Sequence, residues 1–140
     1  MDVSAVITRL AAQLSGFVVV AGAADLDAAI ELAPATPAAY VLPLAETADA
    51  PALISVHEQR VVQAFGVVLV VSNLRDATGA AAAAELATRR QAVRAALVGW
   101  VPDAATGLPV GFTGGRLLQF RDGRLWWADD FELTTYYRTP

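Results

Sequence analysis

The sequence predicts an α+β fold, in which a single domain of residues 1–140 combines an antiparallel or mixed β-sheet with two main helices on one face and a C-terminal β-hairpin. Three observations support this prediction. A chain of 140 residues, 56% of them hydrophobic, is long enough to bury one core. Its helical and strand patterns do not alternate regularly, as they would in a parallel wound sheet. Residues 114–137 place a turn-forming dipeptide between two apolar runs.

A helix and a strand are expected first. Residues 2–14 carry apolar side chains at helical spacing, and Asp2 or Ser4 can cap the start of the helix. Gly16 ends it. Residues 17–21 then form a short run rich in β-branched side chains, which is typical of a strand.

A short helix and a second strand follow. Residues 25–32 suit a helix, because an aspartate can cap its start and Pro34 stops it. Residues 40–44 predict a strand. Pro43 places that strand at a sheet edge, because proline cannot donate a hydrogen bond to a neighbour. Residues 45–55 show no period and predict a loop.

The longest strand and the longest helix come next. Residues 56–71 begin with polar side chains and become apolar on both faces. This pattern predicts a strand that leaves solvent and enters the middle of a sheet, covered on both sides or by a neighbouring subunit. After a loop at 72–79, residues 79–99 show the apolar stripe of a long helix. A connection rich in Pro and Gly, residues 102–113, leads to the hairpin.

The turn of the hairpin is predicted at Asp122-Gly123. Both central residues of a type I′ turn need positive φ, and this dipeptide accepts that conformation. Strands are therefore expected at 115–121 and 124–137.

One polar residue interrupts the apolar face of the second hairpin strand. A two-residue turn places Arg116 opposite Asp129, so we expect these residues to form a structural pair. Asp130 and Glu132 point to the other face and do not converge with Asp129. The acidic cluster is therefore expected to be structural or to lie at an interface, rather than to bind a metal or catalyse a reaction.

The sequence offers no catalytic, metal-binding or cofactor-binding constellation. There is no cysteine, so disulfides, thiol nucleophiles and Cys-ligated metals are excluded. The single histidine, His57, has no nucleophile near it in the sequence, and no phosphate-binding loop is present. We therefore expect neither an enzyme nor a bound cofactor. A net charge of −4 predicts no non-specific affinity for nucleic acid, and no apolar stretch reaches the ~20 residues of a membrane span.

Candidate interface residues fall into two groups. The polar side of the long helix carries three arginines, for which a solvated surface and a subunit contact are the two interpretations: Arg89, Arg90 and Arg94. The outer face of the hairpin offers aromatic and acidic side chains that could meet such arginines on a neighbour: Trp126, Asp130, Glu132 and Tyr136.

Three segments carry a resemblance to a known family. They are "GAADLDAAIELAPATPAAYVLPLAE" after an N-terminal helix and strand, "FGVVLVVSNLRDATGAAAAAELATRRQAVRAALVGWVPD" in the middle, and "GGRLLQFRDGRLWWADDFELTTYYR" at the end. Through these segments and their order, nearly the whole chain resembles the tail terminator, or tail completion, proteins of long-tailed bacteriophages and prophages. The likeness rests on the order of elements and not on a catalytic motif.

The resemblance implies a mechanical role. It implies an α/β domain that forms a homohexameric ring on the finished tail tube, stops polymerisation of the tube protein and presents a surface to head-connector proteins. DNA would pass through the lumen without specific binding. The protein would begin in the host cytoplasm, where a monomer in isolation is compatible with the resemblance, and end in the virion tail. The alternatives are another neck or tail component, such as a head-closure or tube-like protein, and a small ligand-binding regulatory domain.

Overall fold

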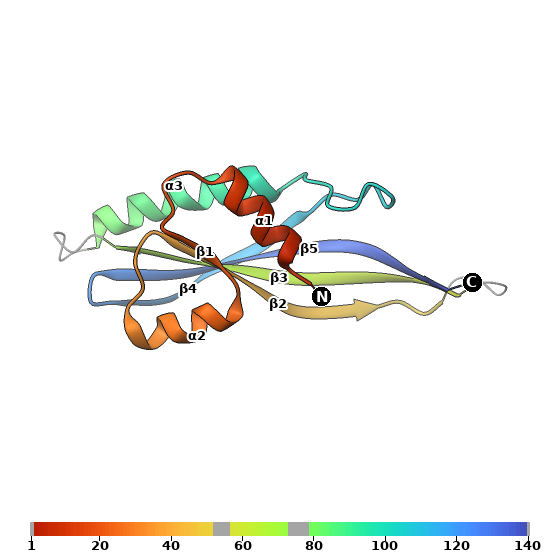
Figure 1. Cartoon of the computed structure of the whole chain (residues 1–140), viewed down its shortest axis with the longest axis horizontal. Helices are drawn as coiled ribbons and strands as arrows, with labels where there is room; N and C mark the ends of the chain where they lie inside the picture. The colour runs from red at the N-terminus through yellow and green to blue at the C-terminus, as the bar shows by residue number, and fades with distance from the viewer. Residues whose placement is uncertain (1, 52–56, 73–78, 140) are drawn as a thin grey trace.

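A computed structural model describes residues 2–51, 57–72 and 79–139, which form three helices and five strands (Figure 1). In chain order the elements are α1 (Ser4–Gln13), β1 (Val19–Ala21), α2 (Ala23–Leu32), β2 (Ala38–Ala48), β3 (His57–Ser72), α3 (Ala80–Leu97), β4 (Gly111–Arg121) and β5 (Arg124–Thr139). The strands form one sheet in the order β1-β2-β3-β5-β4. Only β1 and β2 are parallel, so the sheet is mixed. The sequence predicted an antiparallel or a mixed sheet, and the second alternative is the one observed.

The helices cover both faces of the sheet. Figure 1 shows α1 and α3 on one face and α2 on the other. The prediction of two main helices on one face is confirmed by α1 and α3, but the position of α2 on the opposite face was not predicted. Helix α2 covers this face because the second half of β3 is apolar on both sides. Val67 and Leu69 belong to the core under α1 and α3, whereas Val68 and Val70 belong to the core under α2.

The long strand β3 behaves as its sequence predicts. It begins exposed at His57 and is buried from Phe65 to Val71. In the sheet it lies between β2 and β5. A strand in this position needs apolar side chains on both faces, which explains its continuous run of valine and leucine.

Strand β2 is longer than the sequence predicts. A loop was expected from residue 45, but pairing continues to Ala48, which lies opposite Val61. The polar first half of β3 supplies this partner, which sequence periodicity alone does not reveal. Pro43 does lie on an edge, because β1 pairs with β2 only as far as Tyr40. The rest of the predicted loop and the loop after β3 lie largely outside the described residues.

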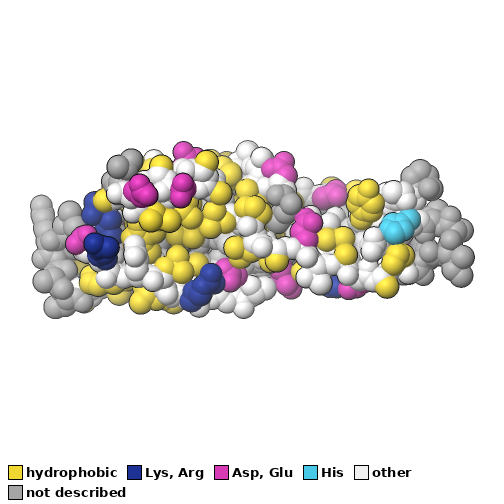
Figure 2. Space-filling model, turned by 90° about the horizontal axis from the view of Figure 1, so that it is seen from below, with side chains coloured by type: hydrophobic (Ala, Val, Ile, Leu, Met, Phe, Trp, Pro, Cys, Tyr) yellow, Lys and Arg dark blue, Asp and Glu magenta, His cyan; other side chains and the backbone are white. Residues whose placement is uncertain are grey.

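Three strands extend beyond the helices (Figure 1). We call this extension the β-arm and define it as residues 43–48, 57–64 and 132–139, which remain paired along its length. Figure 2 views the molecule from the α2 side and shows hydrophobic side chains gathered around α2, with a more mixed surface along the β-arm. The molecule therefore has one thick end with two cores and one thin end made of sheet alone.

The hairpin turn is confirmed at Asp122 and Gly123, which have φ angles of 54° and 72°. Close to the turn the predicted register also holds, with Phe120 opposite Leu125. Farther away it is wrong, because strand β4 contains irregularities next to Leu118 and Thr113 that each insert one residue.

Replacing Gly123 with Val should lower the free energy of unfolding by about 1–2 kcal/mol, because a β-branched residue resists positive φ. Chemical denaturation would measure this loss. Gly123→Asn is the matched control, since asparagine tolerates the left-handed region, and it should cost less. Equal stability of Gly123→Val and the wild-type protein would contradict the turn assignment.

Candidate assembly surfaces

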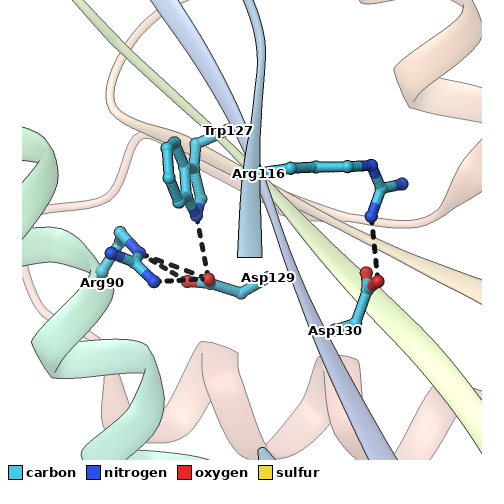
Figure 3. A network of polar contacts seen from close by, with 5 residues as sticks. All are labelled: Arg90, Arg116, Trp127, Asp129 and Asp130. Carbon is cyan, nitrogen blue, oxygen red and sulfur yellow. Dashed lines mark hydrogen bonds and ion pairs between the residues drawn. The ribbon is translucent and has the colours of Figure 1, made fainter. Parts of the chain in front are cut away.

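A buried carboxylate joins α3 to the sheet (Figure 3). The side chain of Asp129, on β5, is 0% exposed. Arg90, on α3, donates from Nε to Oδ2 at 3.0 Å and from Nη2 to Oδ1 at 2.9 Å, and Trp127 donates its indole N–H to Oδ1 at 2.8 Å. The Arg90 guanidinium also lies 4.5 Å from the centre of the Trp127 ring. The charge is therefore neutralised inside the subunit, and the pair fixes the helix on the strand.

Gly115, on the neighbouring strand β4, leaves room for this buried pair. A Cβ placed there would overlap the Asp129 carboxylate, and would lie 2.8 Å from Trp127 Nε1 and 3.0 Å from Arg90 Nη2. Gly115 therefore lets the backbone of β4 approach the three polar groups closely.

The predicted pair of Arg116 with Asp129 is wrong. The extra residue next to Leu118 shifts the register, so that Arg116 lies opposite Ala128. Its side chain points to the α2 side of the sheet and donates from Nη1 to Asp130 Oδ2 at 2.9 Å (Figure 3). Asp129 points to the α3 side, where Arg90 reaches it. The sequence correctly marked Asp129 as a buried charge that needs a cation, but it indicated the wrong cation.

The predicted arginine cluster is largely used inside the subunit. Arg90 binds Asp129, and Arg89 lies over the Phe17 ring at 5.2 Å while forming an ion pair with Glu85 at 3.5 Å. Arg94 lies 5.6 Å from the ring of Phe112. Of the three arginines, we retain only Arg94 as a candidate for contact with another protein.

The second predicted group also changes. Trp126 is only 5% exposed, because its face of the sheet is covered by α2, so its assignment to an accessible outer face is wrong. Asp130 is half-buried and bound to Arg116. Glu132 and Tyr136 are exposed on the β-arm. These two residues and Arg94 stay predictions for a subunit or partner contact.

Exposed apolar side chains gather on the outermost strand, β4. Among the described strands it has no neighbour beyond it, and Leu117, Leu118 and Phe120 are 54%, 46% and 44% exposed. An edge strand of this length presents unpaired backbone groups together with apolar side chains, which is the property of a surface that pairs with another chain. Sequence periodicity could not reveal it, because it does not tell an edge strand from an inner one.

The ionisable groups of the described residues gather into no metal or catalytic centre. No three acidic or histidine side chains within the described ranges lie close enough to hold a metal ion. His57 is exposed and its Nε2 lies 2.6 Å from Gln59 Oε1. Burial raises the pKa of the Tyr40 hydroxyl, and the nearby charge of Asp25 adds to the shift. Within the same ranges, no helix has the length and hydrophobicity that crossing a bilayer requires.

These observations define a class of protein. A buried ion pair holds a helix to the sheet, and the exposed features include a long sheet edge with apolar side chains and a protruding β-arm. Exposed strand edges and apolar patches favour contacts with other protein chains, so these features are typical of a structural assembly protein.

Comparison with known protein families shows which family within this class the chain belongs to. The family model described as phage tail terminator protein matches residues 1–139, so the chain belongs to the phage tail terminator family. No curated protein matches the chain in sequence. Family membership makes it a structural, non-enzymatic component of the phage tail with a role in terminating the tail tube.

Proposed function

We propose that the protein closes the end of the tail tube as a ring of six copies, blocks further addition of tube protein and offers its other side to the head-connector or neck protein. Membership of the tail terminator family supports the termination step. The observation that supports a ring is the open sheet, which has two different edges in each subunit, at β4 and at β2 with β1. A contact between two different surfaces repeats from copy to copy and closes when the rotation permits.

The charge of the chain suits a conduit for DNA. Its net charge is −4, so a ring of identical copies is acidic and does not attract the phosphate backbone of DNA passing through it. A weak contact between two subunits is sufficient, because the tube end holds several copies side by side and raises their effective concentration. A protein that is monomeric in solution is therefore compatible with a ring on the tube.

The functional test compares phage tails made with and without this protein. A deletion strain should produce overlong tails or tails that do not join heads, and the purified protein added to growing cognate tubes should fix their length. Electron microscopy of tube ends measures both outcomes. Tails of normal length that join heads in the deletion strain would remove the proposal. Binding to isolated heads but not to tube ends would instead favour a head-closure role.

A further inference from the structure

We propose that neighbouring copies join by pairing the free edge of β4 in one subunit with the free edge of β2 in the next, so that one β-sheet continues from copy to copy. The inference rests on the proposed ring and adds the strands that connect it. The occupant of each edge is thus a second copy of this chain. Four properties of the sheet lead to this assignment.

The first property is that both edges are open over similar lengths. Strand β4 is the last strand of the sheet, and its exposed surface runs along most of Gly111–Arg121. At the other side, β1 pairs only with residues 38–40 of β2. The remaining part of β2, residues 41–48, has no outer neighbour among the described strands.

The second property is strand direction. Strand β4 is antiparallel to β5, β5 is antiparallel to β3, and β3 is antiparallel to β2. Strands β2 and β4 of one subunit therefore run in opposite directions. Rotation about an axis roughly along the strands keeps these directions, so β4 meets the β2 of the next copy as an antiparallel partner.

The third property is the offset between the two edges. Through their partners in β5 and β3, Gln119 lies level with Val70, whereas Ala45 lies level with Ala64. Joining these two residues needs a shift of six residues, about 20 Å, over a repeat of four strands, β2, β3, β5 and β4, which is about 19 Å wide. The strands then tilt by about 46°, close to the upper end of the range of about 35–45° found in closed sheets.

Other shifts fit less well. Opposite residues must share a face of the sheet, so the shift must be an even number of residues. A shift of eight gives a tilt of about 54°, which lies outside that range. A shift of four gives about 35°, but it places Arg121 opposite Tyr40, which already pairs with β1 on its outer side. The six-residue shift also places the open part of β2 along residues 114–121 of β4, so both free edges are used over most of their length.

The fourth property is the complementarity of the side chains. Strand β4 carries Arg116 and Arg121 and no acidic residue, whereas β2 and the residue after it carry Glu46 and Asp49 and no basic residue. In the six-residue register Arg116 lies opposite Thr47 and diagonal to Asp49 on one face. Both charges also have a partner in their own subunit, Asp130 for Arg116 and Arg60 for Asp49, and the contact would add to these exposed pairs. Leu44, 46% exposed, comes next to the exposed apolar residues of β4.

Engineered cysteines test the contact directly, because the natural chain has none. One matched pair is Gln119→Cys with Ala45→Cys, and a second is Arg116→Cys with Thr47→Cys; all four positions are exposed in the subunit. Each double variant is assembled on cognate tubes and oxidised, and its products are separated without reductant. Each matched pair should give a ladder of covalent multimers that ends at the closed ring, since opposite residues lie within disulfide range.

Two controls show whether the ladder reports the proposed register. Gln119→Cys with Glu46→Cys places the two thiols on opposite faces of the sheet, so it should stay monomeric. A mixture of the single variants Gln119→Cys and Ala45→Cys should stop at dimers, because each copy has only one thiol.

Amide exchange of the wild-type protein is the second measurement: residues 41–48 and 114–121 should exchange about tenfold more slowly on tubes than in solution.

The outcomes separate this inference from the proposed function. Tubes that are capped normally, but without a ladder from either matched pair and without slower exchange at both edges, would overturn the strand pairing and leave the capping role intact. Slower exchange at both edges supports the pairing even where a cysteine variant fails to cap. If the wild-type protein does not bind tube ends, both the proposed function and the pairing fall.

Discussion

Replacing Arg90 with Ala is expected to lower the free energy of unfolding by about 3 kcal/mol. The substitution leaves the Asp129 carboxylate, which is 0% exposed, without its cation. Uncompensated buried charges cost about 3–5 kcal/mol, and we expect the lower end because Arg90 itself is 21% exposed. For a domain of this size the loss corresponds to a fall of about 10 °C in Tm. Calorimetry or urea denaturation measures it.

Arg116→Ala is the matched control, since it removes an arginine–aspartate bond of the same length from a more exposed site. It should cost less than about 1 kcal/mol. The double variant Arg90→Ala/Asp129→Ala should be less destabilised than the sum of the two single variants, because it removes the unpaired charge together with its partner. If Arg90→Ala were as stable as Arg116→Ala, the pair would not hold α3 on the sheet.

Gly115→Ala is expected to cost about 2 kcal/mol of unfolding free energy, although it adds only one methyl group. The added Cβ would overlap the Asp129 carboxylate and crowd Trp127 and Arg90, so either the pair separates or the backbone of β4 moves away. The Trp127 indole N–H resonance should shift at the same time, because that group donates to Asp129.

The neighbouring residue supplies the control for this prediction. Gly114 lies in the same strand, and a Cβ placed there meets no atom within 4 Å. Neither glycine has a positive φ, so backbone strain does not distinguish them. Gly114→Ala should change the unfolding free energy by no more than about 0.5 kcal/mol. Equal effects of the two substitutions would show that space around Asp129 is not limiting.

Features set by residue types within one segment could be predicted from the sequence, whereas contacts between distant segments could not. The turn at Asp122-Gly123 and the burial gradient of β3 could be predicted, because each depends on residue types within one segment. The partner of Asp129 could not. It depends on an irregularity next to Leu118, which has no sequence signature here, and on the position of α3, which approaches β5 from a distant part of the chain.

The candidate surfaces show the same limit. A strand that is apolar on one face looks the same in sequence whether it lies inside a sheet or at its edge, so the exposure of Leu117 could not be predicted. The assignment of Trp126 to an outer face was wrong because the sequence did not predict that the short helix α2 covers that face. Both errors concern where a strand or helix lies relative to the sheet. The spacing of apolar residues along the sequence carries no information about this position.

The position of β3 at the centre of the sheet also affects how the chain folds while it is being synthesised. Its partner β5 begins only after α3 and β4 have been added. At about 5–20 residues per second, β3 leaves the ribosome several seconds before β5 exists. During that interval its apolar residues Phe65–Val71 can pair with β2 on one side only. The core is therefore complete only after β5 has been made, and until then one edge of β3 stays exposed to pairing with other chains.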